Sequence, residues 1–339
     1  MADAVARVPV TRTIGPADDL VVALESLRVG GVTELRLAPG LYEVFDRDVQ
    51  VHAGTAEQPI TVIAADPDDP PLVRGSLVLQ NPVFWTIDRL VFQGGHSGYE
   101  ALRMSGGKNW RILRSEFMGL PGYSSMALLN IAAYRKTAPQ AFRVAYSCFH
   151  NGPTTPPSVH DHLVYVTSSL PPSPSYISRN IFWANRNGAA IKTNSSNVRV
   201  NFNTFQDVAG AVTVQETGAA RWGLRGVMTE RNLVQTVRKL RGIHYTHVFW
   251  ASMLDQSPRR QAKWLIRGNY AYSSNKPLYL QRSYSGADTV RIVGGGLHTT
   301  SGNPGFRRLG DCNGYRPTLP AAKKYGRWAG DGRSMLPPR

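Results

Sequence analysis

Short segments in which apolar and polar residues alternate recur along most of the chain, and turns separate them. The clearest stretch runs from Tyr176 to Gln215 and contains two copies of one unit. Each copy has two strand-like segments, with an Asn where the first segment turns; Asn180 and Asn203 are 23 residues apart. A strand–turn–strand unit that repeats at such an interval predicts stacked coils.

The same unit continues on both sides of this stretch. The positions equivalent to Asn180 are Ser115, Ser147, Asn203, Asn232 and Asn269. Polar side chains of one kind that stack at a turn can hydrogen-bond along the stack. The repeat therefore predicts a ladder of Ser and Asn side chains at one corner of the coils. An ordinary β-sandwich or barrel is the alternative fold.

Over roughly residues 30 to 300, this pattern resembles the right-handed parallel β-helix of the pectate-lyase-like superfamily. The resemblance implies an all-β fold, a single-stranded right-handed parallel β-helix or solenoid. Ahead of it, residues 16–29 place Leu20, Leu24 and Leu27 on one helical face. We expect an amphipathic α-helix there that caps the open end of the first coil.

The predicted organisation has three parts. We expect an N-terminal segment with the capping helix at 1–30, the β-helix domain at 31–302 and an irregular basic tail at 303–339. Of the two cysteines, Cys148 falls in an apolar position beside the ladder, which predicts a buried thiol. The cysteines do not settle the compartment.

The charge of the chain favours acidic partners. Lys and Arg number 39 and Asp and Glu 23, which gives a net charge of +16. Such a balance attracts polyanions. The charges are scattered and no nucleic-acid-binding motif is present, so we expect an acidic polysaccharide or oligosaccharide as partner and no nucleic acid.

No apolar run has the length of a membrane span, and we expect a monomer. We expect a secreted, periplasmic or extracellular protein. The start, Met1 to Arg7, nevertheless lacks the basic and apolar regions of a signal peptide, so a cytoplasmic location stays open.

The second strand of each coil predicts which side chains face outward, because strand side chains alternate between faces. The inward set is apolar: Val164, Val166, Ala189, Ile191, Val212, Val214, Leu278 and Leu280. The outward set is Tyr165, Thr167, Ala190, Lys192, Thr213, Gln215, Tyr279 and Gln281. With long loops on either side at 150–162, 170–175, 216–226 and 235–247, the outward set predicts a polar shelf for an extended chain molecule.

The strongest local signal is His160-Asp161-His162 at the entry to a shelf strand, with Tyr165 three residues on. Two histidines and a carboxylate could hold a metal, with Glu216 approaching from a later coil, or could place a general base. Structural histidines in a loop are the alternative. The metal ligands stay unassigned.

Two groups of the superfamily resemble this chain locally. Mannuronan C5-epimerases of the β-helix type carry an Asp-Pro-His-Asp motif, which His160 and Asp161 match while Ser158 and Val159 replace its first two residues. Polysaccharide lyases of the alginate and chondroitin type have a Lys base, which Lys192 resembles. Their Arg-His pair one coil later is replaced by Gln215-Glu216.

Both resemblances imply removal of the proton at C5 of a uronate. The substrate carboxylate must then be neutralised, by Arg, Lys, a protonated acid or Ca²⁺; no cofactor is assigned beyond that option. The candidate catalytic residues are His160, His162, Tyr165 and Lys192. The candidate substrate-binding residues are Asp161, Arg186, Gln215, Glu216, Trp250, Tyr279, Gln281 and Arg282.

The favoured hypothesis is a polysaccharide lyase that cleaves by β-elimination. A C5-epimerase shares its first step. A glycoside hydrolase needs converging carboxylates, which are sparse near the shelf. A non-catalytic polysaccharide-binding or adhesin β-helix is the alternative of another class.

Overall fold

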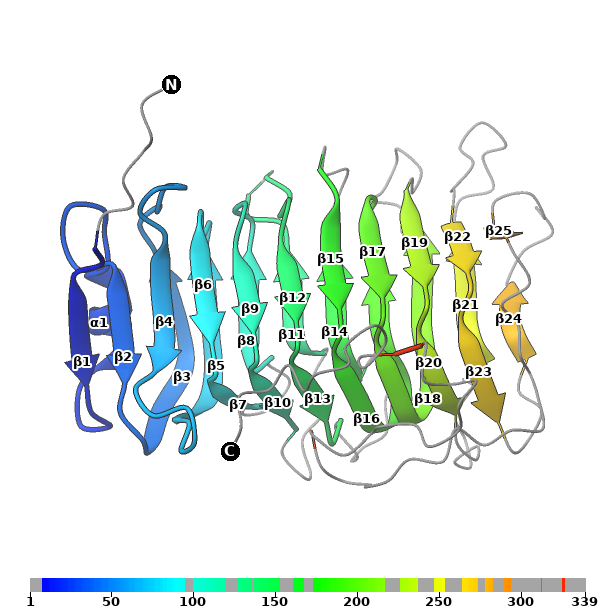
Figure 1. Cartoon of the computed structure of the whole chain (residues 1–339), viewed down its shortest axis with the longest axis horizontal. Coiled ribbons are helices and arrows are strands. Elements are labelled where there is room, and N and C mark those ends of the chain that lie inside the picture. Colours follow the sequence, from blue (N-terminus) through cyan, green and yellow to red (C-terminus); the bar gives the residue numbers. More distant parts are fainter. Residues whose placement is uncertain are drawn as a thin grey trace.

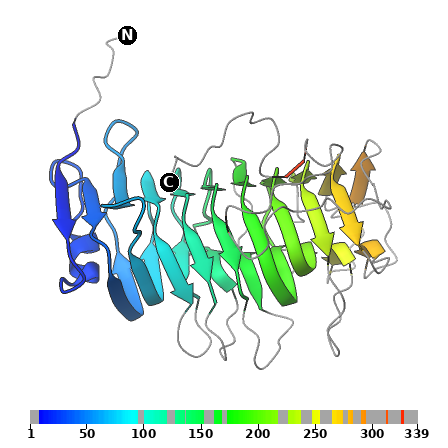
Figure 2. The same ribbon diagram turned by 60° about the horizontal axis from the view of Figure 1, so that its bottom comes forward.

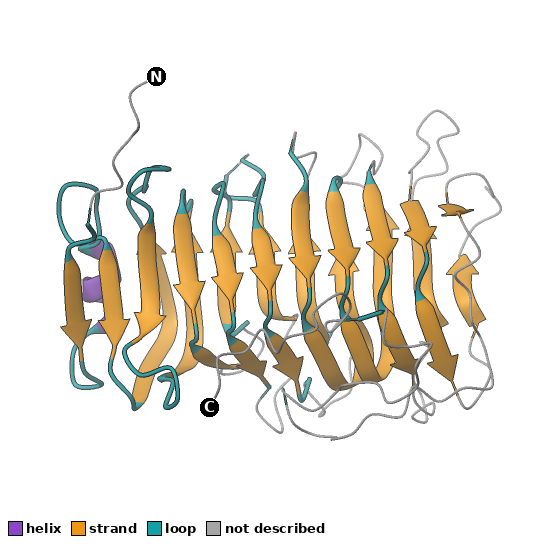
Figure 3. Ribbon diagram, viewed as in Figure 1, coloured by secondary structure: helices purple, strands orange, loops and turns teal. Residues whose placement is uncertain are grey.

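The chain forms coils that stack along one axis, as the computed structural model shows (Figure 1). The structure describes residues 8–94, 100–119, 127–135, 137–152, 161–167, 173–216, 226–236, 247–253, 264–273, 278–282, 290–293, 312 and 325–326. The view turned by 60° shows the strands of successive coils lying side by side along this axis (Figure 2). Strands make up nearly all of the described secondary structure (Figure 3).

One sheet runs the length of the stack and contains 11 strands within the described residues, each paired in parallel with the next coil. Its strands are β1 (Thr11–Ile14), β2 (Glu34–Leu37), β4 (Ile60–Ala64), β6 (Trp85–Asp88), β9 (Arg111–Leu113), β12 (Arg143–Ala145), β15 (Ser175–Ser178), β17 (Val198–Asn201), β19 (Val227–Glu230), β22 (Trp264–Arg267) and β25 (Val290–Val293).

The second sheet contains 14 strands in the part of the chain that the structure describes. They are β3 (Leu41–Gln50), β5 (Leu72–Gln80), β7 (Val91–Gly94), β8 (Leu102–Ser105), β10 (Glu116–Met118), β11 (Ala127–Ala132), β13 (Cys148–His150), β14 (His162–Thr167), β16 (Ile181–Thr193), β18 (Thr204–Glu216), β20 (Leu233–Thr236), β21 (His247–Met253), β23 (Tyr270–Ser273) and β24 (Leu278–Arg282).

The second sheet has two arms, which long strands join. The first arm includes β13 and β20, and the second arm includes β14 and β21. The N-terminal half of β16 pairs with β13, and its C-terminal half pairs with β14. Strand β18 likewise pairs with β20 in its first half and with β21 in its second. Its pairing with β16 shifts register between Asn185 and Ala189. This shift marks the bend between the arms, so one continuous strand serves both faces of a coil.

The predicted ladder is present. The backbone N–H of Asn180 donates to Oδ1 of Asn203 at 2.9 Å, and that of Asn203 donates to Oδ1 of Asn232 at 2.8 Å. The chain of bonds extends to Ser147, which donates to Asn180 at 2.9 Å, and to Asn269, which accepts from Asn232 at 3.0 Å. These Asn side chains are fully buried, so each bond satisfies groups that water cannot reach.

The residue immediately before each ladder position has a left-handed backbone conformation. Arg114, Tyr146, Arg179, Phe202 and Arg231 have φ between 49° and 59°, a range that costs an L-residue roughly 1–2 kcal/mol. Before Asn269 the residue is Gly268, with φ of 54°. The tight corner needs this conformation, and the ladder bonds that follow it offset the strain.

Aromatic rings stack inside the coils in the same direction as the ladder. Phe117, Phe149, Phe182 and Phe205 form a continuous stack in which neighbouring ring centroids lie 4.6–5.0 Å apart. All four are fully buried. Stacked pairs stabilise by roughly 0.5–1.5 kcal/mol beyond the area they bury, so the stack holds successive coils in register.

The capping helix is present but shorter than expected. Helix α1 spans Leu20–Glu25, whereas the pattern predicted a helix over 16–29. It begins where the Asp19 carboxylate accepts hydrogen bonds from the N–H groups of Val21 and Val22, at 2.8 and 3.1 Å. Leu20 and Leu24 of this helix are buried against the first coils, so the helix closes the end of the core (Figure 1).

The prediction that Cys148 is a buried thiol is wrong, because Cys148 forms a disulfide with Cys312. The partners are 164 residues apart in sequence, and their Cα atoms lie 5.6 Å apart. The bond holds part of the predicted tail against β13. Tyr325 of the same tail packs on Tyr270, and the N–H of Gly326 donates to the Arg231 carbonyl at 2.9 Å. Among the described residues, no helix is long and apolar enough to cross a membrane.

Candidate functional site

A row of mostly polar side chains crosses the second arm of the second sheet, one residue from each coil. We call it the outward row: Arg103, Asn130, Tyr165, Lys192, Thr213, Trp250 and Gln281. Each member is paired in register with the next, so consecutive Cα atoms are separated by about 4.8 Å. The pairings of Tyr165 with Lys192 and of Lys192 with Thr213 match the predicted outward set.

The inward face is as predicted. Val164, Ile191, Val212 and Phe249 share one register and are buried in the core. Leu280 continues this register as the partner of Phe249. Because the alternation is strict, the residues between them point to the opposite face.

The middle of the shelf is more buried than predicted. Lys192 is 7% exposed, and Thr213 is 1% exposed although its register faces outward. Two residues before the row members in each strand lies a buried apolar row, formed by Leu128, Leu163, Ala190, Ala211 and Val248. The expectation that Ala190 and Thr213 form an open shelf is therefore wrong, and Lys192 lies beside an apolar surface.

Lys192 is a buried amine that has no counter-ion among the residues the structure describes. Within the described part of the chain, no carboxylate lies within ion-pair distance of it, and its closest charge-stabilising neighbour is the Tyr165 ring, whose centroid is 5.0 Å from Nζ. Burial lowers the pKa of Lys192 below its usual 10.5, because the charged form loses water. A lysine in this environment can act as a general base.

Tyr165 lies next to Lys192 and has its hydroxyl oxygen fixed. Asn194 Nδ2 donates a hydrogen bond to Tyr165 Oη at 2.8 Å. Burial, the larger effect, raises the pKa of Tyr165 above its usual 10.0, although the bond from Asn194 opposes the change. The phenol thus keeps its proton at neutral pH. Since its oxygen already accepts from Asn194, its O–H can donate to a bound molecule.

His162 and Asp161 lie beneath the row. Both are fully buried. The His162 ring is 5.5 Å from the Tyr165 ring, and its Nδ1 bonds the Ala189 carbonyl oxygen at 3.1 Å, which makes Nδ1 the protonated nitrogen of the neutral ring. The Asp161 carbonyl accepts from Asn185 at 3.2 Å. These contacts fix the start of β14, from which Tyr165 projects.

Arg103 and Asn130 extend the row beyond Tyr165. Arg103 and Asn130 both approach the buried Glu100 carboxylate, at 3.6 and 3.3 Å. Nε of Arg103 is buried and has no hydrogen-bond partner within the described part of the chain. The side chain of Arg103 is 40% exposed. A guanidinium that one carboxylate holds and that is partly exposed can bind an anionic group through its exposed part.

The remaining predicted site residues have varied positions. Gln215 shares the face of Thr213 and is half-buried, and Trp250 pairs with Thr213 in the row. Gln281 pairs with Trp250, and Tyr279 lies two residues before Gln281 on the same strand. Arg282 pairs with Ala251, in the register of the core-facing residues. Arg186 lies in β16 and Glu216 ends β18, but their side chains are outside the described residues, as is all of His160.

Sequence reasoning did not find Arg103, Asn130 and Asn194. The first two lie on coils whose lengths differ from the later ones, so their register with Tyr165 could not be counted from the chain. Strand β21 was also missed. Residues 235–247 were expected to be an insertion, and residue 247 is the first residue of β21. The continuous apolar run Val248-Phe249-Trp250-Ala251, rich in β-branched and aromatic residues, was the signal that could have found it.

Within the described residues, the outward row contains no group of side chains that could bind Ca²⁺ or another metal ion. The one group of three potential ligands found there is Cys148, His150 and Cys312, on the other arm. No family model matches the chain, and no curated protein sequence is similar to it.

Solved structures do match. An alginate lyase from Paenibacillus sp. str. FPU-7 superposes with a TM-score of 0.55 at 15% identity, over 84% of this chain and 94% of that one. Jun a 1, the major allergen from cedar pollen, gives a TM-score of 0.49 at 13% identity, over 80% and 78% of the two chains. A pectate lyase gives 0.45 at 10% identity, over 84% and 79%.

The fold is a right-handed parallel β-helix. The likeness to the alginate lyase carries this conclusion, together with the stacked parallel coils described above. At such low identity, the match establishes the fold and leaves the chemistry to the residues of this chain.

Proposed function

We propose that the protein is a polysaccharide lyase that cleaves an acidic, uronate-containing chain by β-elimination at the outward row. The observation that carries the proposal is the pairing of a buried amine, Lys192, with a protonated phenol, Tyr165, on adjacent coils; no described residue supplies a carboxylate partner for the amine. β-Elimination needs one base and one acid that reach the same sugar. These two side chains have those properties and that proximity.

The proposed steps are simple. The neutral Lys192 amine removes the proton at C5, next to the carboxylate, and the electron pair forms the C4–C5 double bond as the C4–O bond breaks. The Tyr165 hydroxyl protonates the departing C4 oxygen. Asn194 keeps the phenol oriented by donating to its oxygen. His162, which is fully buried, is a positioning residue because it packs on Tyr165 and does not reach substrate.

Substrate binding would follow the row. A sugar chain laid along the coils presents roughly one ring per coil, because a coil rises by about 4.8 Å. Arg103, three coils from Lys192, would bind the carboxylate of a uronate about three rings along the chain through the exposed part of its guanidinium. Trp250, one coil beyond Thr213, would stack on a sugar ring. The net charge of +16 also favours a polyanionic chain.

The other enzymatic options receive less support. A hydrolase needs two carboxylates on either side of one bond, and the outward row contains neither Asp nor Glu. An epimerase shares the first step but returns a proton to the opposite face of C5. It remains the second candidate because Lys192 could remove the C5 proton and Tyr165 could donate a proton to C5 from the other side.

The test is the ultraviolet absorbance of the unsaturated uronate product. The protein is incubated with alginate, pectate, hyaluronan, chondroitin, heparin-type chains and glucuronan, each with Ca²⁺ or EDTA. We expect a rise on one polymer. Lys192→Gln should lower the rate by about 10²–10⁴-fold, whereas Lys108→Ala, at an exposed position outside the row, should leave it unchanged.

A rise that survives Lys192→Gln would refute the assigned base. If no polymer gives a rise but solvent deuterium enters C5, the protein is an epimerase. If neither occurs and binding persists, the row is a binding surface and the enzyme proposal fails.

We also propose that the protein works in an oxidising compartment outside the cytoplasm. The Cys148–Cys312 disulfide supports this, because structural disulfides persist mainly in secreted and periplasmic proteins. Thiol alkylation of the protein in fractionated native cells tests it: alkylation of both cysteines in the working pool would refute it.

A further inference from the structure

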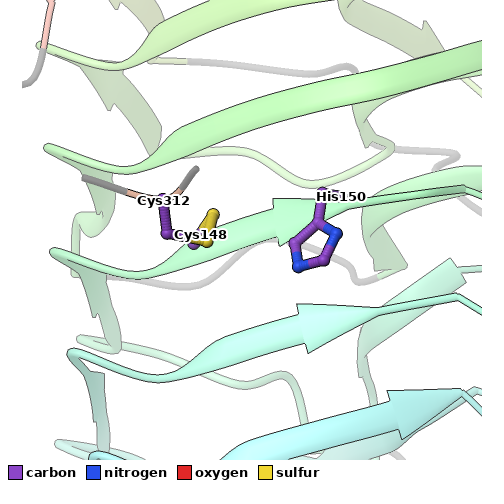
Figure 4. A group of neighbouring side chains, drawn as sticks. All are labelled: Cys148, His150 and Cys312. Atoms are coloured by element: carbon purple, nitrogen blue, oxygen red, sulfur yellow. A yellow bond between two sulfur atoms is a disulfide. The ribbon is translucent and has the colours of Figure 1, made fainter. Parts of the chain in front are cut away.

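Three potential metal ligands lie together on the first arm of the second sheet. The outward row crosses the second arm, so the two sites are separate. Cys148 and His150 are two residues apart on β13, so both side chains project from the same face. Cys312 reaches this face from the C-terminal part of the chain (Figure 4). The two Sγ atoms and a ring nitrogen of His150 all lie within 4.8 Å of one another.

The cluster is sheltered from water. Cys148 is 3% exposed and His150 is 6% exposed. Cys148 packs on Ile181, and the His150 ring stacks on Trp183, with centroids 4.6 Å apart and planes 6° apart. The ligand groups are therefore held in place by packing rather than by mobile surface contacts.

His150 has the arrangement of a metal-binding histidine. Its Nε2 lies 2.8 Å from Oε1 of Glu116, while its buried Nδ1 has no hydrogen-bond partner within the described part of the chain. A buried polar atom without a partner costs about 1–3 kcal/mol, so this nitrogen points to a missing ligand. Metal-ligating histidines commonly have their other nitrogen held by a carboxylate.

We propose that the thiol form of Cys148 and Cys312, together with His150, binds Zn²⁺. The chain has this form before the disulfide is made, or after a phosphine or dithiol reductant cleaves it. Cleavage adds two electrons and two protons to the S–S bond and oxidises the reductant. Zn²⁺ then displaces the two thiol protons, and His150 ligates through its neutral nitrogen.

Zinc fits this ligand set best. Two thiolates and one imidazole are typical zinc ligands, and a water molecule completes the tetrahedron. The ion would join Cys312 to β13 as the disulfide does. The C-terminal part of the chain would therefore stay attached in either redox state, by a covalent bond or by a metal.

Cobalt provides the direct test, because Co²⁺ in a tetrahedral thiolate site is coloured. The protein is reduced with a phosphine, freed of reductant and titrated with Co²⁺, then with Zn²⁺ as competitor. We expect sulfur-to-cobalt charge-transfer bands and intense tetrahedral bands, which Zn²⁺ abolishes at one equivalent. The oxidised protein should show neither, because its sulfur atoms are bonded to each other.

Variants separate the ligands from adventitious binding. His150→Ala keeps both cysteines, so it can be purified in the disulfide form and then reduced; its affinity should fall by about 100-fold or more. Glu116→Gln should lower the affinity by about 10-fold, since it removes an outer carboxylate. His52→Ala, at an exposed histidine, is the matched control and should bind like the unaltered protein.

Stability offers an independent measurement. Zn²⁺ should raise the Tm of the reduced protein but not that of the oxidised protein, because the ion binds only the folded thiol form. The proposal is overturned if reduced protein gives no thiolate bands, or if His150→Ala binds Co²⁺ as tightly as the unaltered protein.

Discussion

Lys192 Nζ lies 5.0 Å from the centroid of the Tyr165 ring, and the two residues are directly paired on neighbouring coils. The ring stabilises the ammonium weakly, by roughly 0.5–2 kcal/mol, and supplies no hydrogen-bond acceptor. Burial therefore dominates. It lowers the pKa of the base and raises that of the acid, which shifts both groups toward the protonation states that the proposed reaction needs.

The pH dependence of the proposed reaction follows from the lowered pKa of Lys192 and the raised pKa of Tyr165. The rate should rise with pH as Lys192 loses its proton, with a midpoint below 10.5, and should fall again as Tyr165 ionises above 10.0. Tyr165→Phe should lower kcat by about 10²-fold and remove the alkaline limb. Initial rates over a pH series check this; an alkaline limb that survives in Tyr165→Phe would contradict the acid role.

Lys192 should also make folding stability depend on pH. Because its pKa is lowered in the folded state, the unfolded chain binds more protons between that lowered value and 10.5, so the free energy of unfolding rises with pH in this window. Lys192→Met should be more stable than the unaltered protein at neutral pH, and the difference should vanish above pH 10.5. Urea unfolding at several pH values measures it, and taking the difference cancels the opposite contribution of Tyr165. A difference that does not change with pH would show that the amine is not desolvated.

Arg103 should contribute to binding rather than to chemistry. Arg103→Gln should raise KM by about 10-fold or more and leave kcat within about 2-fold, because the guanidinium would contact a sugar away from the bond that breaks. Arg111→Gln, at an exposed position on β9 in the first sheet, is the control. A large fall in kcat with unchanged KM would place Arg103 in the reaction itself.

The ladder should dominate the stability of the middle coils. Asn203→Ala removes the acceptor of the Asn180 N–H and Nδ2 groups, at 2.9 and 3.1 Å, and the donor to the Ile177 carbonyl. Each buried group that loses its partner costs about 1–3 kcal/mol, so we expect a loss of about 3 kcal/mol or more.

Asn201→Ala, two residues earlier on the same coil, is the matched control for the ladder. Its amide oxygen already lacks a hydrogen-bond partner within the described part of the chain, so the loss should be only about 0.5 kcal/mol. Chemical denaturation of both variants compares them, and equal losses would refute a special role for the ladder.

The disulfide should stabilise the chain through the length of the loop that it closes. Cys312→Ser opens a loop of 164 residues and should lower the free energy of unfolding by about 2–5 kcal/mol. Denaturation under oxidising conditions measures this. Reduced, alkylated wild-type protein in the presence of a metal chelator should resemble the variant. Coinciding midpoints for the variant and the oxidised wild type would show that the bond contributes nothing.

Local pattern was enough to predict the coils. The Ser and Asn residues recur at the corners because each must bond to the same residue one coil away, and this requirement is written into the sequence at Asn180, Asn203 and Asn232. The alternation of Val164, Tyr165 and Val166 likewise predicted which face each residue takes, since a strand has a period of two. The capping helix was predicted in place but not in length, because the Asp19 cap begins it four residues later than expected, at Leu20.

Other features depended on the three-dimensional fold. The coils differ in length, so the sequence does not show that Arg103 and Trp250 belong to the row of Lys192; only strand register decides it. The bond between Cys148 and Cys312 joins residues 164 positions apart, which no local pattern encodes. The environment of Lys192 was also decided by the fold, because its loss of water comes from residues brought together across coils. The sequence by itself determined the repeating unit and its faces, and tertiary packing decided which residues meet and which lose contact with water.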